Sequence, residues 1–372
     1  MRVCFFLPSL GDGGAQRQCV ALLNLLQLES NIDLHLILLG RGRYESDLDT
    51  TRITVHRTAV SNFGRPAALG FVVRTLRRIR PQVLMSWLHP ADIWSYPATR
   101  IVRNVRWIAA ERGSFYPDEL NYNLRTRLIS LGADLVIANS AQGKHVWASV
   151  SPRTPVRVIP NLLLSTPPTA EPFDRTGLSD CLYVGRFMPQ KNVTGIASAF
   201  ILFAAAHAGP QLLMAGQGEQ LDDVRQIAAR AGAESRIRIL GFRDDVPSLM
   251  AKSRLLLSFS TFEGMPNVVM EAIAAGLPVL VSDIPEHRAL LGPEYPYYLD
   301  LNATPADGAR MIERAWNEGP GRSAINYAHA SAVLENSAPE KVVAAYLDAF
   351  DSVLAGGGRR ALVGQGGSAD GL

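Results

Sequence analysis

Two acids and two cations in the second half of the chain have the types and spacing to hold a phosphorylated sugar. Glu263 and Glu271 stand with seven residues between them, and Arg186 and Lys191 stand five positions apart after Gly185. A guanidinium can grip phosphate with two parallel N–H groups and an ammonium acts as a point charge, so the cations could clamp a diphosphate. Carboxylates accept hydrogen bonds, and we expect the two glutamates to hold sugar hydroxyls.

The local sequence around the acids predicts a strand, a loop and a helix N-terminus. The apolar run 255–259 suits a buried parallel strand, Gly264 gives the loop a flexible turn, and Pro266 stands where helices often begin. We expect Glu271 to lie one to two turns into that helix, with unpaired backbone N–H groups at its start pointing at an anion. Those N–H groups are those of Met265, Asn267 and Val268. A solvated helix start, with acids favoured by the helix dipole, is the alternative.

The two cations follow a strand-like run at 180–184 and precede a helical pattern. A solvated loop is the alternative reading of Arg186 and Lys191. If both contact phosphate, each charge-assisted contact is worth ~1.5–3 kcal/mol, so losing either would cost roughly tenfold to a hundredfold in donor use.

A glycine-rich loop containing Gly13 and Gly14 follows the first strand-like run, 2–7, and precedes a helical pattern. Glycine lets the backbone approach a ligand closely at a helix N-terminus. A dinucleotide-binding loop is the alternative, but Gln16 stands where its third glycine should fall and no acid ends the second strand. An NADP enzyme could use Arg41 or Arg43 there, so this alternative stays open.

Polar residues also follow the strand-like runs 83–87 and 107–110. Ligands bind at the carboxyl ends of parallel strands, so His89 and Arg112 are candidates for the acceptor side. A lone histidine beside a proline is more often structural than catalytic, and this alternative stays open for His89.

These strings together resemble the family 4 glycosyltransferases over most of residues 1–350. The resemblance rests on the acid, seven residues, acid string ending in Ala-Gly and Pro-Val, on Gly-Arg followed by four residues and then Lys191, and on Gly-Gly-Ala-Gln near the N-terminus. It implies an α/β protein of two doubly wound Rossmann-like domains facing a cleft, the GT-B fold. It also implies transfer from a nucleotide sugar with retention of configuration, without metal or cofactor.

The resemblance implies roles for particular residues. Arg186 and Lys191 would stabilise the leaving diphosphate, Glu263 would hold the transferred sugar, and Glu271 would hold the nucleotide ribose. The donor would also contact Gly13, Gly14, Gly185, Phe242, Gly264, Met265, Pro266, Asn267 and Val268. Many relatives carry Thr-x-His where this chain has Glu111-Arg112-Gly113, and the family histidine is therefore not transferred to His89. The segment 284–288 replaces a Gly-Gly pair of many relatives and receives no role.

Composition sets wider limits. A chain of 372 residues with 47% hydrophobic residues predicts two globular domains. No apolar run is long enough to span a membrane or to act as a signal peptide, so we expect the cytoplasm. The cysteines, Cys4, Cys19 and Cys181, lack metal spacing and are expected to be buried apolar residues.

Charge is distributed unevenly along the chain. Residues 1–165 hold 20 Lys and Arg against 11 Asp and Glu, or +9, whereas residues 166–372 hold 17 against 23, or −6. The densest cluster, from Arg74 to Arg80, should lie largely along one helix. An anionic membrane surface, another anionic partner and a solvated face all stay open for this basic half, and no nucleic-acid partner is expected.

The predicted organisation is an acceptor-side domain at 1–163, a Pro- and Thr-rich linker at 164–178 and a nucleotide-sugar domain at 179–338. A helix at 339–355 would cross back to the first domain, as the resemblance implies, and 356–372 would be a disordered tail. The predicted activity moves a hexosyl or N-acetylhexosaminyl group from a UDP-sugar, or secondly GDP-mannose, to a glycan or polyprenyl-linked acceptor of cell-surface polysaccharide. A nucleotide-sugar-binding protein without transfer and an NADP-dependent oxidoreductase are the alternatives.

Overall fold

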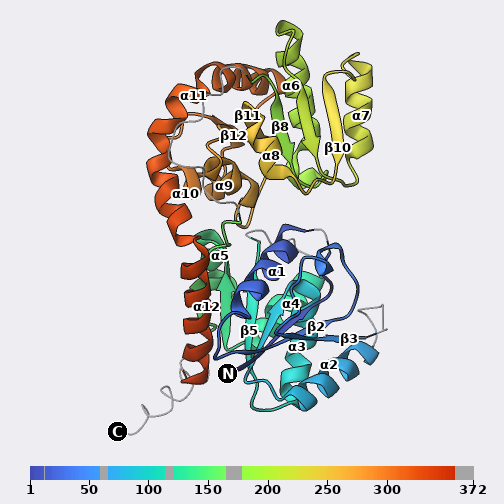
Figure 1. The fold of residues 1–372 in the computed structure, drawn as a ribbon, viewed down its shortest axis with the longest axis vertical. Coiled ribbons are helices and arrows are strands. Elements are labelled where there is room, and N and C mark those ends of the chain that lie inside the picture. The colour runs from blue at the N-terminus through green and yellow to red at the C-terminus, as the bar shows by residue number, and fades with distance from the viewer. Residues whose placement is uncertain (12, 59–65, 114–119, 165–177, 357–372) are drawn as a thin grey trace. The chain divides into compact units, whose positions relative to one another are not determined.

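The computed structural model describes residues 1–11, 13–58, 66–113, 120–164 and 178–356, with the backbone alone for 319–328. The chain divides into two compact units, one of residues 1–162 with 337–372 and one of residues 163–336. Most of the predicted linker, 165–177, lies outside the described residues, as does the predicted tail from 357 onward. Figure 1 labels the helices and strands of both units.

The first unit is built on a parallel sheet in the order β3-β2-β1-β4-β5-β6-β7. Its strands are β1 (Arg2–Leu7), β2 (Asp33–Leu38), β3 (Ile53–Arg57), β4 (Val83–Trp87), β5 (Arg106–Glu111), β6 (Leu135–Ala138) and β7 (Val156–Val158). Its helices are α1 (Gly14–Leu26), η1 (Arg43–Glu45), α2 (Pro66–Ile79), α3 (His89–Ile101), α4 (Leu120–Gly132), α5 (Ala141–Val150) and α12 (Pro339–Leu354). Central strands buried on both faces explain the continuous apolar runs of the sequence, such as Val3–Leu7.

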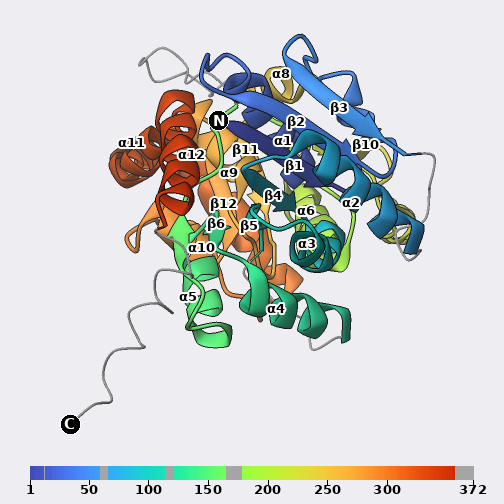
Figure 2. The same ribbon diagram turned by 90° about the horizontal axis from the view of Figure 1, so that it is seen from below.

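Helices cover both faces of this sheet (Figure 2). Cys4 and Phe6 of β1 pack with buried residues of α2 and α3 on one face. Phe5, which points to the other face, meets Phe350 of α12 with ring centroids 6.4 Å apart. Buried Ile129 of α4 and Trp147 of α5 pack on β5 and β6. Alternation along β1 thus places α12 and the α2–α3 pair on opposite faces.

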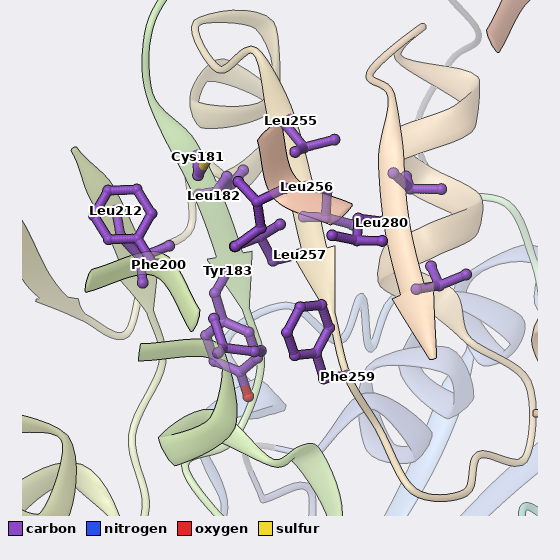
Figure 3. Packing of buried hydrophobic residues seen from close by; sticks show 14 of the residues in the cluster. Cys181, Leu182, Tyr183, Phe200, Leu212, Leu255, Leu256, Leu257, Phe259 and Leu280 are labelled. Atoms are coloured by element: carbon purple, nitrogen blue, oxygen red, sulfur yellow. The ribbon is translucent and has the colours of Figure 1, made fainter. Parts of the chain in front are cut away.

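The second unit repeats the plan with a parallel sheet in the order β10-β9-β8-β11-β12-β13. Its strands are β8 (Cys181–Val184), β9 (Leu212–Ala215), β10 (Ile237–Gly241), β11 (Leu255–Ser258), β12 (Val279–Ser282) and β13 (Tyr298–Leu299). Its helices are η2 (Pro189–Lys191), α6 (Val193–Ala206), α7 (Leu221–Arg230), α8 (Val246–Ala251), α9 (Asn267–Ala274), α10 (Pro285–Leu291) and α11 (Pro305–Asn336). Figure 3 shows its core, in which Leu182, Leu256 and Leu280 come from neighbouring strands.

Most predicted elements are confirmed, and the differences have local causes. The last strand of the first unit, β7, ends at Val158, two residues before Pro160. The arginine cluster lies on α2 except for Arg80, which follows the helix with a φ of 51°. All three cysteines are buried, as expected.

Candidate active site

The loops that carry Lys191 and Glu263 leave the sheet of the second unit side by side. Lys191 follows β8 and Glu263 follows β11, and these strands pair in parallel with Leu255 opposite Cys181. Strand order reverses between β8 and β11, because β9 lies on one side and β12 on the other. Ligands of doubly wound sheets bind at such a reversal, outside the carboxyl ends of the strands.

Gln190 fastens the two loops together. Its carbonyl accepts a hydrogen bond from the Thr261 N–H at 2.8 Å, and its side-chain amide donates to the Phe262 carbonyl at 2.7 Å. These bonds bring Lys191 Nζ within 2.5 Å of Glu263 Oε1. Two residues predicted to act on different parts of a donor are therefore bonded to each other in this structure.

The pair is partly shielded from solvent. The side chain of Lys191 is 21% exposed and that of Glu263 is 11% exposed. Burial alone would raise the pKa of Glu263, but the Lys191 ammonium and hydrogen bonds from Lys191 and Ser260 lower it below its ordinary value. Glu263 is therefore a carboxylate at neutral pH, and Lys191 has an anionic partner before any phosphate arrives.

His287, to which the sequence analysis gave no role, lies close enough to this pair for the charges of Glu263 and Lys191 to affect its pKa. It is fully buried on α10, and its Nδ1 lies 2.8 Å from the carbonyl oxygen of Ser282. Burial lowers the pKa of His287, although the charge of Glu263 raises it, so the ring is neutral at neutral pH. Because a carbonyl only accepts, Nδ1 carries the proton and Nε2 carries the lone pair. The only signal in the sequence was its place, shortly after the apolar run 279–281.

Arg186, the other predicted cation, is exposed on the same loop as Lys191. Its backbone carbonyl accepts the Tyr183 hydroxyl at 2.7 Å, and within the described residues its guanidinium has no recorded hydrogen bond or ion pair. The neighbouring Gly185 is fixed by its N–H, which donates to the Ala215 carbonyl at 3.0 Å. The structure thus leaves the Arg186 head group accessible to an incoming anion.

The start of α9 differs from the sequence expectation. The Asn267 N–H was predicted to be unpaired, but it donates to the Met265 carbonyl at 2.9 Å, because the chain makes a tight turn at Pro266. Gly264 and Pro266 are buried, whereas Met265, Asn267 and Val268 are partly exposed. The prediction of three unpaired N–H groups is therefore wrong for Asn267.

Glu271 is the fifth residue of α9, little more than one turn from its start. It is only 4% exposed, so it belongs to the inner side of this helix. Buried acids are ordinarily hydrogen-bonded or paired with a cation. The ribose-binding role of Glu271 stays a prediction.

Phe242 and its neighbour Arg243 follow β10, the edge strand on the far side of β9. Phe242 is partly exposed instead of being a core residue. Arg243 forms an ion pair with Asp245, and the Arg243 Nε lies 2.7 Å from a carboxylate oxygen of Asp245. No contact recorded among the described residues links Phe242 to the Lys191–Glu263 pair, and its place at the nucleotide base stays a prediction.

In the first unit, Gly13 and Gly14 form the start of α1. The Gly13 carbonyl accepts the N–H groups of Gln16 and Arg17, both at 3.1 Å. A Cβ at Gly13 would lie 2.4 Å from the side-chain oxygen of Gln16, so a larger residue there would displace that side chain. Asp12, the residue before it, lies outside the described residues.

His89 begins α3, directly after Leu88, which has a φ of 79° that non-glycine residues seldom adopt. Its Nε2 donates to the Asn121 carbonyl at 2.9 Å, and its ring lies 4.7 Å from that of Tyr122. His89 thus connects α3 to α4, and an acceptor-binding role stays a prediction.

Arg112 holds the C-terminal helix to the first unit. Its guanidinium carbon lies 3.7 Å from the Trp87 ring centroid, and its head group donates to Asn161 at 3.2 Å and to the Tyr346 hydroxyl at 2.5 Å. Glu111, the acid before it, is buried and accepts from Arg125 and from the Trp147 indole at 2.7 and 2.8 Å. The structure gives Arg112 a structural role that the sequence did not predict.

Two further observations concern metal-binding clusters and membrane-spanning helices. In the ranges that the structure describes, no three His, Cys, Asp or Glu side chains gather as a metal site. In those same ranges, no helix is long and apolar enough to cross a membrane.

Residues 174–330 match the model of the family described as glycosyl transferases group 1. This matched stretch contains the loops of Lys191, Glu263 and His287. Most of the second unit is thus similar to a group 1 glycosyltransferase domain, and the chain is a glycosyltransferase.

Two relatives of known name are also glycosyltransferases. The chain is 25% identical over 276 residues to the lipopolysaccharide core biosynthesis glycosyltransferase LpsE of Rhizobium meliloti, which covers 72% of this chain and 75% of that protein. It is 32% identical over 123 residues to an Escherichia coli UDP-Gal:alpha-D-GlcNAc-diphosphoundecaprenol alpha-1,3-galactosyltransferase, covering 32% of each. The pyridine-nucleotide alternative has no support from these relatives.

The fold also matches a solved structure. Anabaena HepE in complex with UDP and glucose superposes with a TM-score of 0.78 at 19% identity, covering 95% of this chain and all of that chain. The two parallel-sheet units are those of the GT-B glycosyltransferases, and the fold predicted from the sequence is confirmed.

Proposed function

We propose that this glycosyltransferase moves a hexosyl or N-acetylhexosaminyl group from a nucleotide diphosphate sugar, with a UDP-sugar as first choice and GDP-mannose as second. The galactosyltransferase among its relatives is named for a UDP donor, and HepE was solved with UDP. The acceptor is a glycan or a polyprenyl-linked sugar of cell-surface polysaccharide, in line with the diphosphoundecaprenol acceptor and the lipopolysaccharide pathway in the relatives' names.

The observation that carries the proposal is the 2.5 Å Lys191–Glu263 pair at the strand reversal of the group 1 domain. An ammonium has three N–H donors, and Glu263 uses one of them. Lys191 can therefore keep its bond to Glu263 while donating to a diphosphate oxygen. Each oxygen of a carboxylate can accept more than one hydrogen bond, so Glu263 can also accept from a sugar hydroxyl, and the pair would join both ends of the donor.

In the proposed reaction, the bond from the anomeric carbon to the diphosphate oxygen breaks and its electron pair stays on that oxygen. The acceptor hydroxyl forms the new bond on the same face of the sugar, and its proton passes to the diphosphate. Lys191 and Arg186 stabilise the negative charge that develops on the leaving group, which is the work a metal does in other enzymes. We propose that configuration is retained and that no metal is needed.

The test is release of nucleoside diphosphate from a panel of UDP-, GDP- and ADP-sugars, with and without EDTA and with membrane extract as a source of acceptor. Release from one donor, unaffected by EDTA and lost in Lys191→Ala and Glu271→Ala, is the expected result. Lys252→Ala is the matched control, because Lys252 is an exposed lysine of the same unit outside the site. Release that EDTA abolishes would overturn metal independence, and full activity in Lys191→Ala would overturn the proposed site.

A further inference from the structure

Helix α4 of the first unit buries a charged residue beside the apolar Ile129 and exposes three leucines. Its inward face carries Arg125, which is only 4% exposed. Its outward face carries Leu120, Leu124 and Leu131, which are 84%, 41% and 49% exposed. A surface helix ordinarily turns its apolar residues inward and its charges to solvent, so this arrangement calls for a reason.

Buried ion pairs fix the rotation of α4 in this state. Arg125 donates through Nε to Asp92 at 2.7 Å and through its terminal nitrogen to Glu111, also at 2.7 Å. A rotation that turned the leucines inward would remove Arg125 from Asp92 and Glu111. Two buried carboxylates would then lack their cation, which is strongly unfavourable. The leucines are therefore held in solvent by the structure of the unit.

The exposed leucines form one stripe with a cation. At 3.6 residues per turn, Leu120, Leu124, Arg127 and Leu131 fall within an arc of about 60°. We call these four residues the α4 stripe. Arg100 of α3 extends it, because its guanidinium donates to the Leu131 carbonyl at 3.1 Å and the adjacent Ile101 is 47% exposed.

The stretch of the first unit that contains the α4 stripe exposes one sign of charge in its described part. From residue 89 to residue 158, the acids within the described part are Asp92, Glu111 and Asp134, and each is at most 5% exposed. The exposed cations of the same stretch are Arg100, Arg103, Arg127, Lys144 and Arg153. The described exposed charges of this stretch are therefore all positive, while Asp118 and Glu119 lie outside the described residues.

Helix α2, where the sequence placed its arginine cluster, lacks the apolar half of this pattern. None of its described residues is among the exposed large hydrophobic residues of the chain. Its Arg78 donates to His56 at 2.8 Å, which ties one of its cations to β3. Charge alone binds an anionic surface weakly, whereas charge together with buried apolar area binds it more strongly.

We propose that the α4 stripe and its flanking cations dock this glycosyltransferase on an anionic lipid bilayer, with the leucines entering the headgroup region. A second copy of the chain fits this surface poorly, because a two-fold contact would set cations against cations. The proposal deepens the proposed function by naming how the enzyme reaches a membrane-held acceptor.

The experiment measures sedimentation of the full chain with vesicles of phosphatidylglycerol and phosphatidylcholine, and it uses no nucleotide sugar. We expect binding to the anionic vesicles that falls with added salt, and little binding to phosphatidylcholine. The double variant Leu124→Asn, Leu131→Asn should bind at least about tenfold more weakly, because two leucines lose their apolar area.

Leu202→Asn with Leu301→Asn is the matched control, since these leucines of the second unit are 48% and 50% exposed. Equal binding of the stripe variant and this control, or no binding of the unaltered chain, would overturn the proposal. Light scattering that shows a dimer lost only in the stripe variant would assign the surface to self-association instead. Diphosphate release in detergent is scored separately, so failure here is distinct from failure of the proposed function.

Discussion

Lys191 and Glu263 show how one contact can serve two predicted roles. Their side chains stand 72 residues apart in the chain and meet at 2.5 Å. An ammonium held by a carboxylate keeps its position before the substrate binds, so less side-chain freedom is lost when phosphate arrives. The role of Glu263 therefore includes placing Lys191.

Glu263→Gln should lower turnover roughly tenfold to a hundredfold, because the amide keeps the shape of the side chain and loses the charge that holds Lys191. The pKa of Glu263 lies below its unfolded-state value of about 4.3. The stabilisation from the pair is thus complete above about pH 4.3 and is lost as pH falls through the lower folded-state pKa. Urea unfolding between about pH 2.5 and 5 should show this loss in the parent protein and a flatter profile in the variant. The exposed Glu234→Gln, as control, should behave like the parent.

His287 offers a second test at the residue scale. His287→Asn keeps an N–H donor near the Ser282 carbonyl, whereas His287→Leu removes it and leaves a buried carbonyl without that partner. The leucine variant should lose about 1–3 kcal/mol more unfolding free energy than the asparagine variant. Equal unfolding free energies, measured in urea, would show that the hydrogen bond to Ser282 contributes nothing.

At the scale of elements, the loop that carries Arg186 and Lys191 packs its backbone against the backbone of the loop after β9. Gly216 has a φ of 143°, and a Cβ there would lie 1.8 Å from the Gly185 carbonyl oxygen. The Phe187 N–H donates to the Gln217 carbonyl at 2.8 Å in the same contact. The position of Arg186 and Lys191 thus relies on a glycine on the neighbouring strand's loop.

Gly216→Ala should therefore weaken donor use and lower stability by more than the backbone strain alone. Gly232→Ala is the matched control, because Gly232 has a φ of 62° with open space around its Cβ position. The control should cost about 1–2 kcal/mol for the left-handed conformation. A Gly216 variant no less stable than the control, by thermal unfolding, would contradict the packing argument.

A polar chain across β2, β3 and α2 predicts a pH dependence of the first unit. Arg78 donates to His56 Nδ1, so His56 Nε2 donates to His35 Nδ1 at 3.1 Å, and His35 Nε2 faces Asp33 at 3.3 Å. Burial is the first cause that lowers the pKa of both histidines. Each contributes stability that is complete above its unfolded-state pKa of about 6.5 and is lost as pH falls through the lower folded-state value.

Histidine NMR titration should give both rings pKa values under about 6.5. Urea unfolding should show stability falling below that pH. Arg78→Gln should raise the pKa of His56 by removing a neighbouring cation. A pKa of His56 that is unchanged in this variant would contradict the proposed chain of bonds.

At the scale of the whole molecule, the first unit is made from both ends of the chain. Phe350 of α12 packs against Phe5 with ring centroids 6.4 Å apart, and Tyr346 stacks on Trp87 at 6.5 Å. These rings are buried, so the first 162 residues complete their core only with a helix from beyond residue 336.

Phe350→Ala should lower the unfolding free energy of the first unit by about 3–5 kcal/mol, because it empties a buried aromatic site. The neighbouring Asp351→Ala, at an exposed position, should change it by less than about 0.5 kcal/mol. Urea unfolding followed by tryptophan fluorescence measures both, since Trp87 lies in the affected core. A small effect of Phe350→Ala would show that the first unit folds without α12.

The sequence by itself determined the strands, the loops and the fold class. Buried parallel strands read as apolar runs, as at 255–258, and glycines mark loops where the backbone must come close. The motif residues Arg186, Lys191, Glu263 and Glu271 fell on those loops and the following helix for the same local reason. Their roles towards a donor stay predictions.

Only the tertiary structure decided which side chains meet. The Lys191–Glu263 bond and the hydrogen bond from Arg112 to Tyr346 each join segments distant in sequence, which no local pattern records. Arg125 looks from the sequence like a surface residue beside Arg127, yet it is buried because Asp92 and Glu111 converge on it from other elements. Long-range packing chooses the partner of a charge, and the partner decides whether that charge lies inside or in solvent.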